Sequence, residues 1–383
     1  MGRATRGCGC AVAVLAVVIG VAAIAWLKFG LPWWRMKPPP PSGGELQIHV
    51  LDVGPIEGDA ILIISPAGKA VLIDAGDTGK GKVVLDALRR YSVKQIDYFI
   101  ATHPHPDHLG GAAEVIKAIK VLAVIDNGLA PAVPPDLVPQ PKTPDGASSL
   151  KKPASKKPGL SASITKFFDE YKAAVNQSGA HYEKAEPGQK YDIGAGARLT
   201  ILGPSQPFFT KEQMKSGGNE PNANSVVVRL DYGDFSMLLP GDAEEQTEHR
   251  MLTKDLNLAA RILKVAHHGS KYATSEDFSM RVKPEVAIIS CGDWNHYGHP
   301  SQVVLDRLRA VSAKVYRTDL QGEISVTTTG KLKGDKLYDI KTAREAKTDI
   351  WTGRIAQKDD STRAGFIAYG DFGPPPKNVN RKP

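Results

Sequence analysis

The chain has 383 residues, of which 49 are lysine or arginine, 41 are aspartate or glutamate and 42% are hydrophobic. This length allows one large domain or two smaller ones, and the aliphatic content excludes a wholly disordered chain. The three cysteines exclude a disulfide scaffold, because Cys8 and Cys10 lie in one apolar stretch and Cys291 is alone. The net charge of +8 permits an anionic partner without requiring one.

The N-terminal region, residues 1–44, contains an uncharged segment at residues 8–27 that is nearly all Ala, Val, Ile, Leu or Gly. This length matches the roughly 20 residues that cross a hydrocarbon core of about 30 Å. Two interpretations stay open: a transmembrane anchor, which the length favours, and a cleaved export signal. A Pro-rich and then Gly-rich linker follows it. Either interpretation places the rest of the chain outside the cytoplasm, anchored to the membrane or exported.

After the linker, short apolar runs alternate with longer amphipathic ones, which predicts strands interspersed with helices. The expected strands span residues 46–53, 60–65, 70–73, 96–101, 121–125, 197–202, 225–230, 235–239, 260–265, 286–290, 314–317 and 323–328. The expected helices span residues 83–91, 111–119, 164–175, 244–252 and 302–311. This pattern predicts an α/β domain over residues 45–330, with mixed sheets covered by helices.

Two stretches do not fit the alternating pattern. Residues 130–160 are rich in proline and contain paired lysines, so we expect a flexible insertion. Its lysines are either solvated or available to attract phosphate. Residues 331–383 are polar and end in prolines and a basic tip, and their role is not indicated by the sequence.

A His-rich loop, residues 101–111, carries the strongest chemical signal. Three histidines and one aspartate, His103, His105, Asp107 and His108, fall within six residues directly after an expected strand. Imidazole nitrogens and carboxylate oxygens are the ligands that suit zinc, manganese or iron. Because side chains alternate along an extended segment, His103 and His105 are expected to face one ion. Asp107 and His108 can then face a second ion.

This loop resembles the HxHxDH signature of the metallo-β-lactamase superfamily of metal-dependent hydrolases. Other segments are similar to the C-terminal hydrolase domain of ComEC-type competence proteins, and the resemblance spans residues 46–329. These segments are Asp52-Val53-Gly54, Gly58-Asp59-Ala60, Asp74-Ala75-Gly76, Pro240-Gly241-Asp242, His267-His268-Gly269-Ser270 and His299-Pro300. The resemblance implies a four-layer αββα sandwich with two divalent metal ions, Zn or Mn, at the ends of the sheets.

The same resemblance implies roles for residues outside the His-rich loop. Asp74 would hold the loop in place as a carboxylate behind the metal ligands. Asp242 would bridge the two ions, and the alternative for it is an N-cap of the following helix. His267 or His268 would complete the second site. Adjacent residues at a strand end point in opposite directions, so we expect only one of the two to bind metal.

Further residues are candidates for contact with the substrate. His299 is expected to donate to a substrate oxyanion or, alternatively, to make a structural hydrogen bond in a tight turn, and Asn295 has the same two options. Ser270 and Asn224 are expected near the substrate. Many superfamily members place another histidine ahead of the strand at 225–230, where this chain has Asn222-Ala223-Asn224. An amide is a weaker ligand than imidazole, which makes manganese as plausible as zinc.

These observations predict a hydrolase in which a metal-activated water attacks the substrate, with Asp107 assisting as ligand and proton acceptor. The resemblance and the basic charge favour a phosphodiester substrate such as single-stranded DNA. Aromatic residues that could stack on bases are Tyr272, Phe278, Trp294 and Tyr297. The alternatives are an ester, lactone or β-lactam hydrolase, or a binding protein without catalysis on the same fold. No protein partner is indicated.

Overall fold

The structure is a computed structural model that describes residues 44–131, 160–213, 220–254, 256–295 and 297–355. The expected N-terminal anchor, most of the expected insertion and the end of the polar tail lie outside the described residues. Of the helices that the structure describes, none has both the length and the apolarity to span a membrane.

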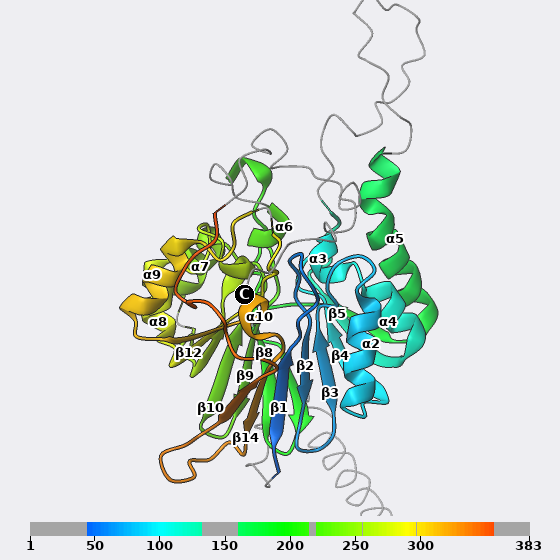
Figure 1. The fold of residues 1–383 in the computed structure, drawn as a ribbon. Helices are drawn as coiled ribbons and strands as arrows, with labels where there is room; N and C mark the ends of the chain where they lie inside the picture. Colours follow the sequence, from blue (N-terminus) through cyan, green and yellow to red (C-terminus); the bar gives the residue numbers. More distant parts are fainter. Residues whose placement is uncertain (1–43, 132–159, 214–219, 255, 296, 356–383) are drawn as a thin grey trace, which may run out of the picture.

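Two mixed sheets form the centre of the fold (Figure 1). The first has the order β15-β14-β1-β2-β3-β4-β5-β6, and the second has the order β13-β12-β11-β10-β9-β8-β7. The strands of the first sheet are β1 (Leu46–Val50), β2 (Ile61–Ile64), β3 (Ala70–Ile73), β4 (Gln95–Ile100), β5 (Lys120–Asp126), β6 (His181–Lys184), β14 (Ile324–Thr328) and β15 (Asp339–Thr342). Those of the second are β7 (Lys190–Gly194), β8 (Ala197–Gly203), β9 (Val227–Tyr232), β10 (Phe235–Leu239), β11 (Ile262–Lys264), β12 (Val286–Ile289) and β13 (Lys314–Arg317).

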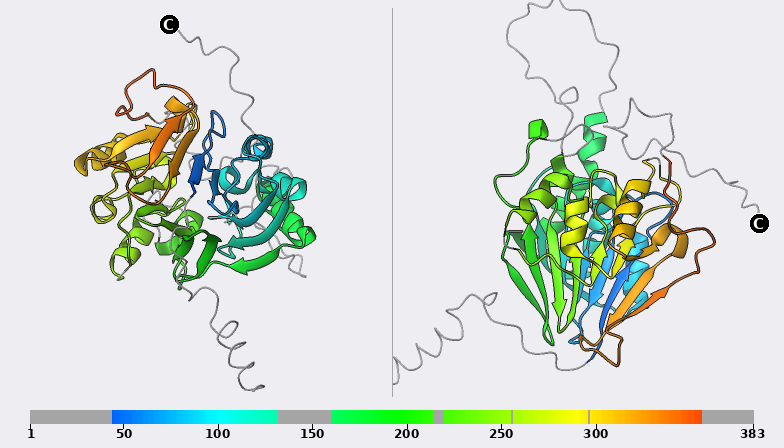
Figure 2. Two further views of the ribbon diagram at one scale, coloured as in Figure 1. Left: turned by 90° about the horizontal axis from the view of Figure 1, so that it is seen from below. Right: turned by 90° about the vertical axis from the view of Figure 1, so that its left-hand side faces the viewer.

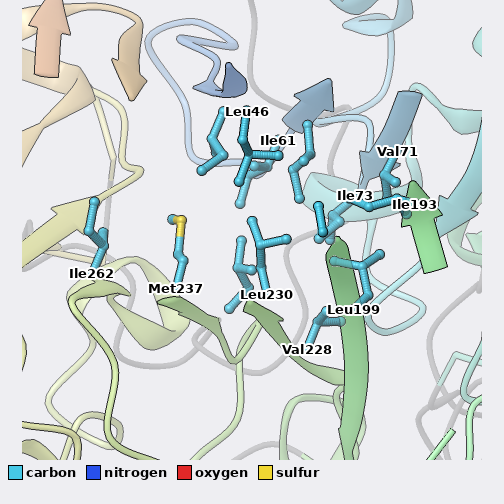
Figure 3. Packing of buried hydrophobic residues seen from close by; sticks show 14 of the residues in the cluster. Leu46, Ile61, Val71, Ile73, Ile193, Leu199, Val228, Leu230, Met237 and Ile262 are labelled. Carbon is cyan, nitrogen blue, oxygen red and sulfur yellow. The ribbon is translucent and has the colours of Figure 1, made fainter. Parts of the chain in front are cut away.

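The inner faces of the two sheets pack against each other through aliphatic side chains. Leu46, Ile48 and Val50 alternate along β1 and are fully buried, as expected for a strand with one face in the core. Figure 3 shows side chains such as Ile61 of β2 and Leu230 of β9 pointing into the same layer. Burial of each such side chain contributes about 1.5–3 kcal/mol, so this layer fixes how the two sheets sit against each other.

Helices cover the outer face of each sheet, which completes four layers (Figures 1 and 2). On the first sheet these are α2 (Gly81–Arg90), α4 (Ala112–Ala118) and α5 (Leu160–Ser178). On the second they are α7 (Glu245–Leu252), α8 (Glu276–Val282) and α9 (Gln302–Ala310). Short helices lie in the connections between these elements: α3 (Pro106–Leu109), α6 (Glu220–Ala223), α10 (Thr318–Gln321), η2 (Lys211–Gln213) and η3 (Ala266–Gly269). The prediction of mixed sheets covered by helices is confirmed.

The structure also contains elements that the sequence pattern did not predict. Besides the short helices, these are the strands β6, β7 and β15 and the helix α8. β15 pairs antiparallel with β14, so the fold continues beyond Gly330 into the polar tail. In the same tail, Gly353 contacts Gln302 of α9 and Arg354 contacts Asp319 of α10. The guanidinium of Arg317, at the end of β13, donates to the carbonyls of Ile350 and Thr352.

Candidate metal centre

The predicted site residues follow four strands whose carboxyl ends lie at one edge of the fold. β3 pairs parallel with β4, and β10 pairs parallel with β11. Asp74 follows β3, the His-rich loop follows β4, Asp242 follows β10, and His267 and His268 follow β11. Parallel strands end at the same edge of a sheet, so residues far apart in the sequence meet there. In Figure 1 this is the upper edge, where α3 lies.

Asp74 holds the His-rich loop from behind. Its Oδ1 accepts a hydrogen bond from the Thr102 amide at 2.8 Å, and its Oδ2 accepts one from the Thr102 hydroxyl at 2.7 Å. The same Oδ2 lies 2.6 Å from Nδ1 of His108. When Nδ1 of His108 donates to Asp74, its Nε2 is left as a free ligand atom. Burial raises the pKa of Asp74, while His108 opposes that shift.

The Nε2 atom of His108 belongs to a buried cluster of possible ligand atoms from Asp107, His108, Asp242 and His268, which we call the inner cluster. Nε2 of His108 lies 3.2 Å from Oδ1 of Asp242 and 3.3 Å from Nε2 of His268. Nε2 of His268 lies 3.2 Å from Oδ2 of Asp107. Ligand atoms placed tetrahedrally about 2.0–2.2 Å from a zinc ion are about 3.3–3.6 Å apart. The spacing of the inner cluster therefore fits one divalent cation.

The inner cluster also has the electrostatics of a cation site. Burial opposes ionisation of Asp107 and Asp242, yet the nearby imidazoles of His108 and His268 hold the pKa of both carboxyls below the usual range. Burial likewise lowers the pKa of His268, but Asp242 and Asp107 outweigh it and raise this pKa to about 10. The two carboxylates thus hold a proton on His268, and a metal ion would replace that proton when it binds. Oδ1 of Asp107 and Oδ1 of Asp242 are buried and have no hydrogen-bond partner among the described residues. These residues thus fit a divalent cation, which would be the missing partner of both oxygens.

His103 and His105 form a second group beside the inner cluster. Nε2 of His103 lies 3.0 Å from Nδ1 of His105 and 3.9 Å from Oδ2 of Asp242. Burial lowers the pKa of both imidazoles, which keeps them neutral and able to bind metal. The same Oδ2 of Asp242 lies 3.6 Å from Nε2 of His268, so the Asp242 carboxylate lies between the two groups. It does not cap α7, because the N-cap of that helix is Glu244.

The two adjacent histidines after β11 lie in a left-handed turn rather than at the end of an extended strand. His267 has φ 48° and His268 has φ 54°, both within η3. Such residues are uncommon and often mark functional sites. His268 joins the inner cluster, and its Nδ1 lies 2.9 Å from the Ser290 carbonyl oxygen. His267 lies at the edge, with Nε2 3.8 Å from Oδ2 of Asp242.

Burial lowers the pKa of His267 to about 3, so this imidazole is neutral at physiological pH. Its Nε2 also lies 3.1 Å from Nδ2 of Asn222. Of the two asparagines weighed as weak ligands, Asn222 is therefore the one beside the site. Asn224 instead exchanges hydrogen bonds with the backbone of Phe209.

The other predicted substrate contacts hold their own loops. Asn295 donates to the carbonyls of Gly292 and His299 and accepts from the His299 amide. Ser270 is buried, and its amide donates to the His267 carbonyl at 2.7 Å. Contact of Asn224, Asn295 or Ser270 with a substrate stays a prediction. The aromatic candidate Phe278 is fully buried between the second sheet and the helices that cover it.

Two buried pairs near the site were not predicted from the sequence. Nδ1 of His299 lies 2.8 Å from Oε1 of Glu57, and both side chains are buried. Nζ of Lys264 lies 2.8 Å from Oδ2 of Asp59, whose Oδ1 is 3.6 Å from Nδ1 of His268. The sequence gives one signal for these pairs: their charged members lie within segments that are otherwise apolar or rich in glycine. Their partners come from distant parts of the chain, so spacing alone does not reveal them.

Comparison with known proteins agrees with this geometry. Residues 53–180 match the Metallo-beta-lactamase superfamily. ComE operon protein 3 of Bacillus subtilis is 28% identical over 303 residues, which is 74% of this chain and 33% of that protein. Recombination protein 2 of Haemophilus influenzae is 28% identical over 315 residues, covering 81% of this chain and 31% of that protein. The chain thus spans about a third of the length of these curated relatives.

Among solved structures, a diphosphatase of the PhnP family is similar with a TM-score of 0.35 and 12% identity, covering 71% of this chain and 94% of that chain. The resemblance to the metallo-β-lactamase superfamily and to ComEC-type competence proteins is confirmed by the family match and the curated relatives. The chain has the hydrolase fold of this superfamily together with a cluster of residues that can hold a metal.

Proposed function

We propose that this metallo-β-lactamase-fold protein is a metal-dependent phosphodiesterase that acts on single-stranded DNA or a related phosphodiester. The observation that carries the proposal is the convergence of Asp107, His108, Asp242 and His268 on one buried point. His103, His105 and Asp242 would hold one divalent ion, and the inner cluster would hold a second. Zinc and manganese both suit this set of imidazole and carboxylate ligands.

The bound ions would supply a water of lowered pKa and neutralise charge that develops on the phosphoryl oxygens. The chain itself positions the ligands and excludes bulk water. Asp74 and Thr102 fix the orientation of His108, and the Ser290 carbonyl fixes that of His268. Besides serving as a ligand, Asp107 would take up the proton that the attacking water releases, as expected from the sequence.

The names of the relatives support a phosphodiester over a carboxylic ester or a lactam. The relatives include a protein described as a competence protein, and others named for recombination and for the ComE operon. The net charge of +8 is compatible with an anionic substrate. The proposed location is outside the cytoplasm, with the N-terminal region as anchor or export signal.

The proposal is tested with the purified full-length chain, supplied with manganese or zinc. The substrates are bis-p-nitrophenyl phosphate, single-stranded DNA, an aryl ester and a chromogenic β-lactam. We expect metal-dependent cleavage of the first two and little turnover of the others. Turnover of the ester or the lactam without any cleavage of phosphodiesters would contradict the proposal.

Asp242→Ala is the matched variant for this experiment. It removes the carboxylate between the two groups of ligands, so we expect turnover to be abolished. The fold should remain, because the side chain lies at the edge of the sheets and not in the layer between them. Circular dichroism checks the fold, and full activity in this variant would rule out the two-ion arrangement.

A further inference from the structure

A buried ion pair joins the two sheets directly beside the inner cluster. Lys264 is the last residue of β11 in the second sheet, and Asp59 lies ahead of β2 in the first sheet. Nζ of Lys264 lies 2.8 Å from Oδ2 of Asp59, and both side chains are almost fully buried. A buried pair of this kind contributes little net stability, because both charges lose their water. Its position beside the ligands indicates another role.

The backbone of Asp59 is bonded to the segments that carry the first-sheet ligands. Its amide donates to the Asp107 carbonyl at 3.1 Å, and its carbonyl accepts from the Gly76 amide at 2.8 Å. Asp107 belongs to the inner cluster, and Gly76 follows Asp74, which supports His108. The Asp59 side chain therefore has a fixed position relative to the ligands of the first sheet.

Lys264 leads into the strained turn that carries His268. Its ammonium group donates to the Val265 carbonyl at 2.9 Å, immediately ahead of η3. His268 has φ 54° in this turn, and residues in such conformations persist only where the surrounding structure holds them. Since its ammonium group also contacts Asp59, Lys264 holds the start of this turn against the first sheet.

The other oxygen of Asp59 lies close to His268 itself. Oδ1 of Asp59 is buried, accepts no hydrogen bond from the described residues and lies 3.6 Å from Nδ1 of His268. The same Nδ1 lies 2.9 Å from the Ser290 carbonyl oxygen, and the Ser290 hydroxyl donates to the Gly58 carbonyl at 2.9 Å. A carboxylate and a carbonyl beside Nδ1 favour a proton there, which leaves Nε2 of His268 as the ligand atom.

We propose that the Asp59–Lys264 pair is a positioning device for His268, which sets the distance between His268 and Asp107 across the two sheets. This inference rests on the proposed metal centre and adds two residues that act through its ligands. A pair that only stabilised the fold would, when lost, weaken both ions or neither. A positioning pair would, when lost, weaken the inner-cluster ion alone.

The test measures binding of manganese or zinc to the full-length chain by isothermal titration, without substrate. Asp59→Asn keeps the size of the side chain and removes its charge. The double variant Asp59→Asn/Lys264→Met leaves no unpaired charge in the interior, so it provides a folded protein if the single variant does not fold. Asp231→Asn is the matched control, because Asp231 forms an ion pair with Arg229 at 2.8 Å on β9, which carries no predicted ligand. Urea denaturation of each metal-free chain measures its stability.

We expect the wild type to bind two ions. Both Asp59 variants should bind one ion with unchanged affinity and the other about 10- to 100-fold more weakly. In a His105→Ala background, which weakens the ion of the second group, the remaining tight ion should show this loss. Asp231→Asn should keep both affinities, whatever its stability. Unchanged affinities in the Asp59 variants, or equal losses at both ions, would overturn the inference.

The same measurements separate this inference from the proposed function. Two ions bound equally well by the wild type and the Asp59 variants, together with cleavage of bis-p-nitrophenyl phosphate, would remove the positioning role and leave the phosphodiesterase. A loss confined to the inner-cluster ion, without any phosphodiester cleavage by the wild type, would leave the positioning role and remove the phosphodiesterase. No metal binding by the wild type would overturn both.

Discussion

Asp74 supports the site from the end of a buried strand, in a backbone conformation with φ 58°. Among residues other than glycine, asparagine and aspartate adopt this left-handed region most readily. The same residue therefore meets two requirements, one of the backbone and one of the His-rich loop. Substitution by asparagine satisfies the first requirement and fails the second.

We expect Asp74→Asn to fold and to bind manganese or zinc about 10- to 100-fold more weakly, because His108 loses the carboxylate that orients it. Isothermal titration with either metal measures the change. Asp97→Asn is the control, since Asp97 accepts from the Ala70 amide within the first sheet and touches no predicted ligand. An unchanged metal affinity in Asp74→Asn would contradict a supporting role.

Glu248 is another buried carboxylate, and its ionisation affects the stability of the fold. Burial raises its pKa from 4.5 to about 7, although the amides of Thr274 and Ser275 donate to it. A carboxyl with a higher pKa in the folded state binds its proton more tightly when folded. Its contribution is therefore fully present below pH 4.5 and is lost as the pH rises through about 7. The loss amounts to about 3 kcal/mol at most.

Glutamine at position 248 does not ionise, so the Glu248→Gln variant does not lose stability in this way as the pH rises. The free energy of unfolding of the wild type should exceed that of the variant by more at about pH 5 than at about pH 8. Urea denaturation at both pH values measures the difference, with the exposed Glu276→Gln as control. A difference that stays constant or grows with pH would contradict the assignment.

The residues of the His-rich loop were predicted as ligands from their spacing after a strand, whereas the roles of Asp74 and Asp242 were implied by the family resemblance. The choice between His267 and His268 was not predictable, since the left-handed turn of η3 leaves no mark in hydropathy. Glu57 and Lys264 were also missed, because the partner of each lies far away in the sequence.

At the scale of elements, the strands that the pattern missed all lie at the edges of the sheets. β6 and β15 end the first sheet, and β7 ends the second. Strands at the edge of a sheet are more exposed to solvent and tolerate polar residues. His181–Lys184 and Asp339–Thr342 therefore show no alternation of apolar residues. Their pairing depends on backbone hydrogen bonds with a neighbour already in place, which a local pattern does not encode.

The tail segment 349–354 gives an element-scale prediction. Arg354→Ala removes the side-chain anchor of the loop that carries His299, so we expect faster amide hydrogen exchange in residues 293–300 and a several-fold lower kcat on phosphodiesters. Arg309→Ala is the matched control, because Arg309 lies over the Trp351 ring, 4.7 Å from its centroid, without touching that loop. Equal exchange in the two variants would show that the anchor is not needed.

At the scale of the whole molecule, two helix-covered sheets bring the ends of β3 and β4 opposite those of β10 and β11. Alternating strands and helices indicated mixed sheets covered by helices, while the four-layer arrangement came from the family resemblance. The buried layer of β1, β2, β9 and β10 holds the two sheets together, so the ligands from one sheet stay at a fixed distance from the ligands of the other. Neither sheet provides a complete metal site, since Asp242 and His268 follow strands of one sheet and His103 to His108 follow a strand of the other.

The most direct test of this account is the metal content of the folded chain. The protein is loaded with manganese or zinc, dialysed and analysed by elemental mass spectrometry, alongside Asp242→Ala treated in the same way. We predict two ions per wild-type chain and a clear loss in the variant, because its carboxylate lies between both groups of ligands. Fewer than one ion per wild-type chain, or equal content in the variant, would contradict the central claim.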